Sequence, residues 1–270
     1  MYIKSMKTKV ANSLYHLIKE LHRAKEQDKK QKTIKVICDW DDVIQPHIPF
    51  IAWELTGKTI SFEEFHEKFW QEYKNHDEFK KKYEVIKEGE SKTKYEKLKK
   101  DPHFYNRSPF LSPAEELLTS LSENLIGELI FLTASDESLF PKGDNRKKEV
   151  FKNTFGHFAQ AQLVFVPYLN GFTPSKGEWI KENHPDFDIF IDDRPDTINE
   201  ASKIFPLDKK IYALPDYGYN QLEENNVYYL ATRVSSLKKE DLIWQETSKE
   251  KANFQTLQEQ FKLSGLKPKL

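Results

Sequence analysis

Short apolar runs and longer amphipathic stretches alternate along most of this chain. Short runs that predict strands lie at about 33–38, 128–132, 162–166, 187–191 and 210–213, and a further run at 227–230 is consistent with an edge strand. Helical spacing of apolar residues marks 114–125, 146–155, 175–183 and 197–204. Strands that alternate with helices are typical of an α/β protein with a parallel sheet. The pattern therefore predicts a doubly wound parallel sheet.

The stretch 47–108 interrupts this alternation, because it is rich in lysine, glutamate and aromatic residues and has helical periodicity. Ser61 and Glu64 have the spacing of a helix-capping box. Phe62, Phe65, Phe69 and Tyr73 follow on one predicted helix face, with Trp70 beside it. We therefore predict a Rossmann-like α/β core with an inserted helical cap. The predicted division is an N-terminal helix and linker (1–32), the core (33–46 and 109–240), the cap (47–108) and a C-terminal helical tail (241–270).

Both ends of the chain carry amphipathic patterns. Apolar residues at helical spacing near the N-terminus predict a helix that docks on the domain, followed by a charged linker at 26–32; these residues are Val10, Leu14, Leu17, Ile18 and Leu21. Phe254, Leu257 and Phe261 predict a terminal helix in the tail. No stretch approaches the roughly 20 apolar residues that span a bilayer, and the N-terminus lacks a secretory signal pattern. An organellar presequence is disfavoured because none of the first twenty-two residues is arginine.

Polar residues follow three of the apolar runs at the point where each ends. Asp39 and Asp41 follow the apolar run in IKVICDWDDVI (34–44), and Thr133 and Ser135 close ELIFLTAS (128–135). Asp192 and Asp193 follow the run in DFDIFIDDRPD (186–196). Open α/β sheets place their sites at the carboxyl ends of strands, so we expect these groups to converge. A fourth segment, TPSKGEW (173–179), adds a lysine near a predicted helix start.

These residue types suit metal-assisted phosphoryl transfer. Residues i and i+2 of an extended segment point the same way, so Asp39 and Asp41 can face one reacting group. One carboxylate can attack phosphorus, and the other can donate a proton to the leaving oxygen and later accept one from water. An oxygen-rich site beside an anionic phosphate favours Mg²⁺. Asp192 and Asp193 would complete the metal ligands, while Thr133 and a lysine would contact the phosphoryl group.

The ordered set Asp-x-Asp-x-Val, Thr, Lys and Asp-Asp resembles the haloacid dehalogenase superfamily of phosphohydrolases. The resemblance covers about 33–46 and 109–213. It implies that Asp39 is the nucleophile and that Asp41 is the general acid/base, which also offers its backbone carbonyl to the metal. It implies phosphate-binding roles for Thr133 and Lys176, with Ser135 nearby, and a metal site formed by Asp39, Asp41, Asp192 and Asp193. Lys181 and Lys142 stay open as alternatives for the lysine. Members commonly carry a helical cap where 47–108 lies.

The Asp-Asp-Arg-Pro segment at 192–195 is similar to the 5'(3')-deoxyribonucleotidase-type branch of that superfamily. The chain departs from the branch at Asp42, where a glycine often follows the second aspartate, and in a longer spacing between the lysine and the acidic pair. The resemblance implies a nucleoside monophosphate or a similar small phosphate ester as substrate. Cap aromatics such as Phe50, Trp53, Phe69 and Trp70 could stack on a base, although helical aromatics more often form a core.

Composition narrows the classes of binding partner further. The 270 residues include 42 Lys+Arg and 43 Asp+Glu, so no global field favours a nucleic acid polymer or an anionic membrane. The one cysteine, Cys38, has no intrachain partner and favours a reducing, cytoplasmic location. We therefore expect a Mg²⁺-dependent phosphatase of small esters. A phosphotransferase of the same fold and a non-catalytic binding or regulatory protein stay open, and the sequence does not indicate the oligomeric state.

Overall fold

A computed structural model describes residues 9–11, 13–27, 33–55, 60–62, 64–66, 69, 89–136, 140, 143–168, 175–205, 211–215 and 227–230. Within them, one seven-stranded sheet has the order β1-β7-β6-β5-β2-β3-β4, and every neighbouring pair is parallel. The strands are β1 (Lys9–Ala11), β2 (Ile34–Cys38), β3 (Ile126–Asp136), β4 (Ala161–Tyr168), β5 (Ile189–Ile191), β6 (Ile211–Pro215) and β7 (Val227–Leu230). The predicted α/β fold with a parallel sheet is confirmed.

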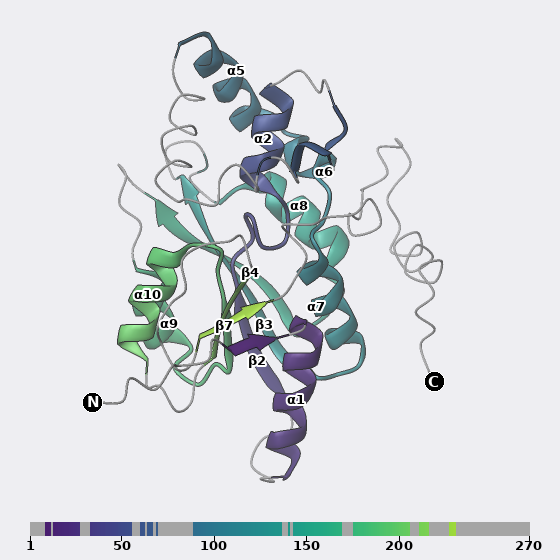
Figure 1. Cartoon of the computed structure of the whole chain (residues 1–270), viewed down its shortest axis with the longest axis vertical. Coiled ribbons are helices and arrows are strands. Elements are labelled where there is room, and N and C mark those ends of the chain that lie inside the picture. Colours follow the sequence, from purple (N-terminus) through teal and green to yellow (C-terminus); the bar gives the residue numbers. More distant parts are fainter. Residues whose placement is uncertain are drawn as a thin grey trace, which may run out of the picture.

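Helices cover both faces of the sheet (Figure 1). Five of them surround it: α1 (Leu14–Gln27), α7 (Ser112–Ser122), α8 (Asn145–Thr154), α9 (Lys176–Asn183) and α10 (Pro195–Ile204). Successive strand residues point to opposite faces, and the buried side chains divide accordingly. Leu129 and Phe131 pack with residues of α1, α7 and α8, whereas Ile130 and Leu132 pack with residues of α9 and α10. The central strands are therefore apolar on both faces.

The strand order reverses direction at β2. From β2 the chain proceeds outward to β3 and β4, then crosses back to β5 on the other side of β2. Such a reversal leaves a crevice at the carboxyl ends of the strands, where ligands bind in open α/β sheets. Cys38, the last residue of β2, lies between Phe131 of β3 and Ile191 of β5. The residues that follow these three strands are therefore brought together.

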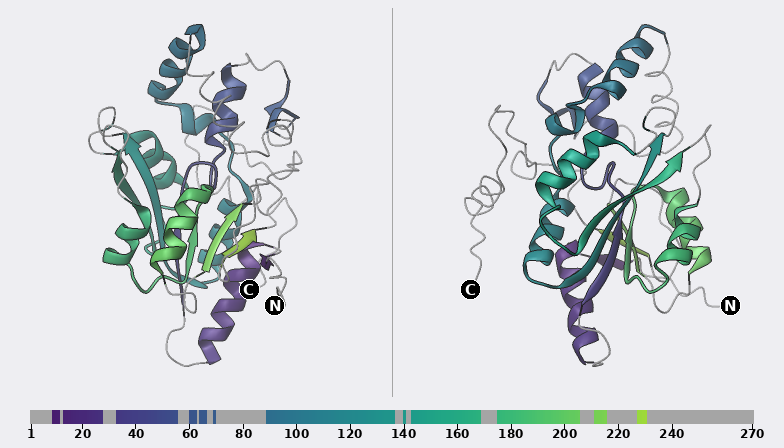
Figure 2. Two further views of the ribbon diagram at one scale, coloured as in Figure 1. Left: turned by 60° about the vertical axis from the view of Figure 1, so that its left-hand side comes forward. Right: turned by 180° about the vertical axis from the view of Figure 1, so that it is seen from behind.

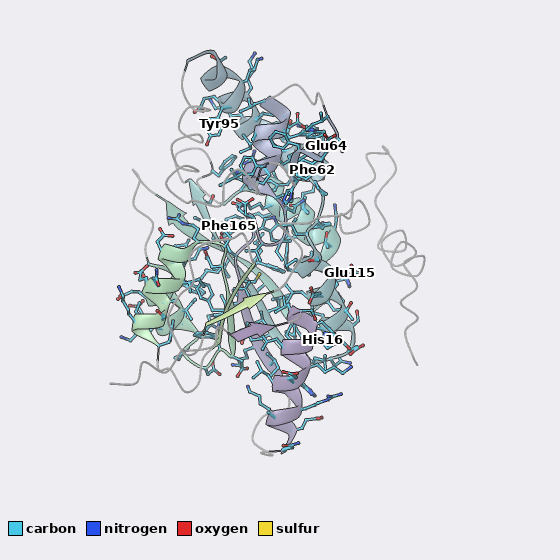
Figure 3. The ribbon with its side chains drawn as sticks, viewed as in Figure 1. His16, Phe62, Glu64, Tyr95, Glu115 and Phe165 are labelled. Atoms are coloured by element: carbon cyan, nitrogen blue, oxygen red, sulfur yellow. The ribbon has the colours of Figure 1, made fainter. Side chains whose placement is uncertain are left out.

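Three further helices lie beyond the carboxyl ends of β3 and β4 (Figures 1 and 2). They are α2 (His47–Leu55), α5 (Gly89–Lys100) and α6 (Phe104–Arg107). Figure 3 shows Phe62 and Tyr95 in this group, far from His16 and Glu115 at the α1–α7 side. The Ser61 hydroxyl accepts a hydrogen bond from the Glu64 amide (3.2 Å), as the capping-box spacing predicted. The described part of 47–108 contains helices and no strand that pairs in the sheet.

The aromatic side chains of this helical group pack mainly on one another. The Phe50 ring contacts those of Trp53, Phe62 and Phe104 at centroid distances of 5.4–5.6 Å. Phe50, Phe62 and Phe69 are buried, and the Trp53 indole donates to the Ile60 carbonyl. These rings therefore form a core, the commoner of the two interpretations made above. Trp70 and Tyr73 lie outside the described residues.

The structure corrects the N-terminal prediction. Val10 belongs to β1, and α1 starts only at Leu14, because the Ser13 hydroxyl accepts from the His16 amide (3.1 Å) and so caps the helix there. Glu116 of α7 accepts from the Tyr15 amide (2.7 Å), which fixes the start of α1 against the domain. The helix runs through Gln27, so the predicted linker at 26–32 begins too early.

The predicted edge strand at 227–230 is present as β7, but it is not at the edge. β1 pairs with its outer side, with Val10 beside Tyr229. β1 has only three residues, too few to show the periodicity that predicts a strand from the sequence. The predicted terminal helix at 254–261 lies outside the described residues. Among the helices that the structure describes, none is both long enough and apolar enough to cross a bilayer.

Candidate active site at the carboxyl ends of the strands

Asp39 occupies the point where β2 ends. Its backbone amide donates to the Ile191 carbonyl of β5 (2.8 Å), so the β2–β5 ladder continues through this residue. Its side chain is buried, and one carboxylate oxygen accepts from the Trp40 amide (2.7 Å). The nucleophile predicted from the sequence is therefore held at the carboxyl end of β2 by two hydrogen bonds.

Trp40 anchors the loop that follows. Its fully buried ring meets Phe131 and Phe155 edge-on, at centroid distances of 5.1 and 6.2 Å. Its indole nitrogen donates to Gln45 (3.0 Å), whose amide donates in turn to the carbonyls of Tyr105 (2.9 Å) and Ser108 (3.0 Å). Trp40 thus points into the core and joins the loop to the segment around α6.

Three buried carboxylates meet beside β5. Oxygen atoms of Asp39, Asp192 and Asp193 all lie within 4.8 Å of one another. Asp192 and Asp193 directly follow β5, and Asp192 accepts from the Arg194 amide (2.9 Å) just before α10. Lys176 reaches the same place from the N-terminus of α9 and contacts Asp39 (2.9 Å) and Asp192 (2.7 Å). We call the three carboxylates of Asp39, Asp192 and Asp193 the acidic cluster, and Lys176 is its counter-ion.

The electrostatics of the acidic cluster show excess negative charge. Burial and the nearby Asp39 carboxylate raise the pKa of Asp192 to about 6, although Lys176 opposes this shift. Burial and the charge of Asp192 raise the pKa of Asp193 well above its usual range. Burial alone would lower the pKa of Lys176, but Asp192 and Asp39 outweigh it and raise this pKa. Two carboxylates, Asp39 and Asp192, stabilise the charge of Lys176. In contrast, three carboxylates share this one lysine.

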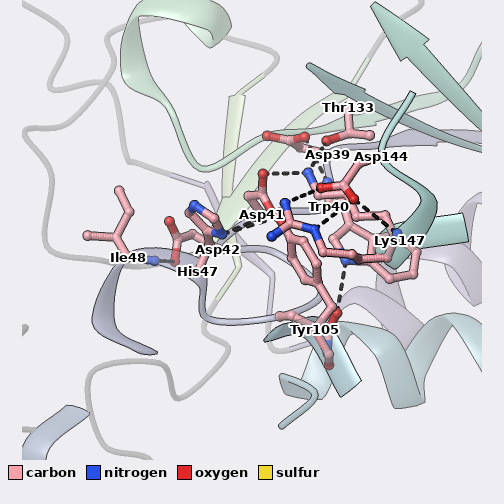
Figure 4. A network of polar contacts seen from close by, with 12 residues as sticks. Asp39, Trp40, Asp41, Asp42, His47, Ile48, Tyr105, Thr133, Asp144 and Lys147 are labelled. Atoms are coloured by element: carbon pink, nitrogen blue, oxygen red, sulfur yellow. Dashed lines mark hydrogen bonds and ion pairs between the residues drawn. The ribbon is translucent and has the colours of Figure 1, made fainter. Parts of the chain in front are cut away.

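Asp41 lies in a second group of contacts, which Figure 4 shows from close by. Lys147 of α8 donates to Asp41 (2.6 Å) and to the Thr133 hydroxyl (2.8 Å), and Tyr105 donates to Asp41 (2.8 Å). Although burial would raise it, the ammonium of Lys147 lowers the pKa of Asp41 to about 2. The Asp41 side chain is therefore ionised at neutral pH.

His47 completes this second group. Its ring stacks on Tyr105 at a centroid distance of 5.8 Å, and Nδ1 lies 3.2 Å from the Tyr105 hydroxyl and 3.7 Å from Asp41. Burial lowers the pKa of His47, so the ring is neutral at neutral pH. Burial and the nearby Asp41 carboxylate raise the pKa of the Tyr105 phenol well above its usual range. Asp41 is thus surrounded by one cation and two neutral polar rings.

Asp42 stands at the position where the resembled branch often has glycine, and its backbone shows why Asp fits there. It has φ = 58°, in the left-handed region that glycine adopts freely and that Asp and Asn tolerate better than other residues. Its buried carboxylate accepts from the Ile48 amide (3.1 Å) in the first turn of α2. Asp42 therefore serves both as a turn residue and as a cap for α2.

We expect Asp42→Ala to be less stable than Asp42→Asn by about 2 kcal/mol. Both variants remove the ionisable group, so the difference in stability between them isolates the cap, about 1 kcal/mol, and the left-handed backbone, about 1 kcal/mol or more. Urea unfolding would measure the difference in free energy. Asp42→Gly should lie between the two, because it loses only the cap. Equal stabilities for Ala and Asn would show that neither contribution matters here.

The structure thus separates the predicted site residues into two linked groups. Asp39, Lys176, Asp192 and Asp193 come together directly, whereas Asp41 and Thr133 meet through Lys147. The Asp41 carboxylate is not part of the acidic cluster, so a metal-binding role of its backbone carbonyl stays a prediction.

The remaining candidates have different outcomes. The Ser135 hydroxyl is buried without a hydrogen-bond partner, and its phosphate-binding role stays a prediction. Lys176 rather than the exposed Lys181 contacts Asp39, and Lys142 lies outside the described residues.

Sequence reasoning missed Lys147, Tyr105 and His47. Lys147 had a detectable signal, because Asp144 precedes it at an N-cap position and so places it in the first turn of the helix after β3. Tyr105 and His47 had none, since they come from segments that only the tertiary structure brings to Asp41.

No model of a protein family matches the chain, and no curated protein matches it in sequence.

Proposed function

We propose that this chain is a Mg²⁺-dependent phosphomonoesterase of the haloacid dehalogenase type that works through an aspartyl-phosphate. The observation that carries the proposal is the position of Asp39: a buried carboxylate at the end of β2, with Lys176, Asp192 and Asp193 against it. The strand order β4-β3-β2-β5-β6 supports a Rossmann-like core whose crevice coincides with this residue.

The residues would divide the chemistry between two steps. Asp39 attacks phosphorus, the bond from phosphorus to the ester oxygen breaks, and that oxygen takes a proton from Asp41. Water then attacks the phosphoryl group and gives a proton to Asp41, which frees phosphate and restores Asp39. Asp41 is ionised in the free protein, so it is ready for the second step. It gains a proton for the first step when an anionic ester approaches, because a nearby negative charge raises the pKa of a carboxyl group.

The acidic cluster is suited to a divalent cation. Its three carboxylates offer oxygen ligands, they are buried, and Lys176 alone leaves them with excess negative charge. Oxygen ligands of this kind are those that Mg²⁺ prefers. A cation held by Asp39, Asp192 and Asp193 would supply positive charge against the phosphoryl oxygens. Removal of divalent cations should therefore abolish turnover.

A small phosphate ester is the proposed substrate class, with a nucleoside monophosphate as the favoured example. The helices α2, α5 and α6 beyond the carboxyl ends of β3 and β4 support this choice, since a cap at 47–108 would screen the site from bulky partners. A cytoplasmic location remains a prediction, supported by the free and buried thiol of Cys38.

Phosphate release decides between this proposal and its rivals. The full chain would be assayed on p-nitrophenyl phosphate and on a panel of nucleotides and other phosphorylated metabolites, with Mg²⁺ and with a chelator. Metal-dependent release supports the proposal and ranks the substrates. Metal binding without turnover of any ester would favour a non-catalytic protein. Capture of the phosphoryl group by an added alcohol would indicate a phosphotransferase.

A further inference from the structure

Lys147 occupies an unusual position for a lysine. Its side chain is 3% exposed, and its ammonium lies between Asp41 of the β2 loop and Thr133 of β3, at 2.6 and 2.8 Å. Its nitrogen is also 5.2 Å from the centroid of the Tyr105 ring. Burial of a lysine is costly unless it is paired, so the position of this side chain is closely determined by these partners.

The helix that carries Lys147 is fixed where it begins. Asp144 caps α8 by accepting from the Arg146 amide (3.0 Å) and also pairs with the Arg146 guanidinium (2.8 Å). The Arg146 guanidinium lies over the rings of Tyr105 and Phe140, at 5.3 and 4.6 Å. The first turn of α8 is therefore held against α6, and Lys147 projects from it towards the site.

The contact with Thr133 has a direction. An ammonium group has three donors and no acceptor, so the Thr133 oxygen must accept from Lys147. The proton of the Thr133 hydroxyl is therefore free to point away from the lysine. A hydroxyl that already accepts from a cation is a good donor to an anionic oxygen, because hydrogen bonds in a chain polarise one another.

We propose that Lys147 is a positioning residue that orients the Thr133 hydroxyl as a donor towards a bound phosphoryl group and ties it to Asp41. This inference rests on the proposed function, since it assigns a task to Lys147 within that site. Lys147 is distinct from Lys176, which neutralises the acidic cluster around Asp39. It acts through Thr133 and Asp41, so its removal alters how the site holds an oxyanion.

A mutant cycle in oxyanion binding tests the inference. Tungstate binding to the Mg²⁺-loaded full chain would be measured by calorimetry for wild type, Lys147→Met, Thr133→Val and the double variant. Each single variant should weaken binding by about 10- to 100-fold, the range for a hydrogen bond to a charged group. The double variant should lose little further affinity: its dissociation constant for tungstate should be at most about threefold above that of the single variant that binds less tightly. Losses that multiply would overturn the inference, because a simple charge effect does not depend on Thr133.

Two matched controls accompany the cycle. Lys152→Met removes an exposed lysine from the same helix and should leave tungstate binding unchanged. Thr133→Ser keeps the hydroxyl and should bind tungstate nearly as well as wild type. Failure of Thr133→Ser to bind would show that packing at this position, and not the hydroxyl, is what matters, which would overturn the inference.

A spectroscopic readout separates this inference from the proposed function. Buried ammonium groups that exchange slowly give nitrogen-15 signals, and the signal of Lys147 should shift in Thr133→Val and in Asp41→Asn. Both variants retain Lys147, so they remain decisive if Lys147→Met does not fold. If wild type neither hydrolyses an ester nor binds tungstate, the proposed function fails. The ammonium signal alone then tests whether Lys147 is coupled to Thr133 and Asp41. An unchanged signal in both variants overturns the inference.

Discussion

Asp39→Asn is expected to reduce turnover by at least about 10⁴-fold on every ester, the order found when a catalytic nucleophile is removed. The amide is a poor nucleophile and cannot form an aspartyl-phosphate. The fold should persist, because the backbone amide of residue 39 still pairs with Ile191 and the side chain keeps an acceptor for the Trp40 amide. Steady-state rates on p-nitrophenyl phosphate and on the best nucleotide would measure the loss.

Two aspartate variants make this result specific to the nucleophile. Asp193→Asn removes a member of the acidic cluster that the mechanism does not use for attack. Its activity should fall at low Mg²⁺ and recover in part at high Mg²⁺, whereas that of Asp39→Asn should not recover. Asp186→Asn changes an exposed carboxylate before β5 and should be active. Near-normal turnover by Asp39→Asn would show that another group attacks phosphorus.

Asp41→Asn is expected to separate the two chemical steps. An aryl leaving group does not need protonation, so the variant should still release about one equivalent of p-nitrophenol per site in a rapid burst. The following steady state should be slow, because no base remains to activate water. An alkyl ester such as a nucleotide should show no burst and should lose roughly 10²- to 10⁴-fold in rate.

Quenched-flow measurement with both ester types would detect these phases, and mass spectrometry of the quenched protein would detect the phosphorylated form. Wild type is the control for burst amplitude, since it should turn over without accumulating much phosphorylated protein. Equal losses on both ester types with no burst would show that Asp41 is not the general acid. A burst with the nucleotide would lead to the same conclusion.

Local chemistry made much of the fold and of the acidic cluster predictable. Parallel strands that are buried on both faces appear as apolar runs, so β2, β3 and β5 were detectable, together with the polar residues that follow them. Because the carboxyl ends of such strands share one edge of the sheet, the convergence of Asp39, Asp192 and Asp193 followed without any contact being known. The position of Lys176 followed similarly, since the Ser175 hydroxyl caps α9 by accepting from the Glu178 amide (3.1 Å).

The surroundings of Asp41 were not predictable in this way. Lys147, Tyr105 and His47 reach it from α8, α6 and α2, and the directions in which these helices point depend on how they pack on the sheet. The sequence carries helical periodicity at these places but no information about which side chain meets which. The low pKa of Asp41 arises from those contacts, so it too was beyond prediction.

By itself, then, the sequence determined the alternation of strands and helices, the polar strand ends and the candidate nucleophile, because each depends on neighbouring residues along the chain. Only the tertiary structure decided that β1 lies outside β7, that Asp42 adopts a left-handed backbone to cap α2, and that Lys147 joins Asp41 to Thr133. The physical reason is the range of the interactions. Periodicity and capping act over a few residues, whereas pairing across 106 positions, as between Asp41 and Lys147, is selected by the packing of the whole domain.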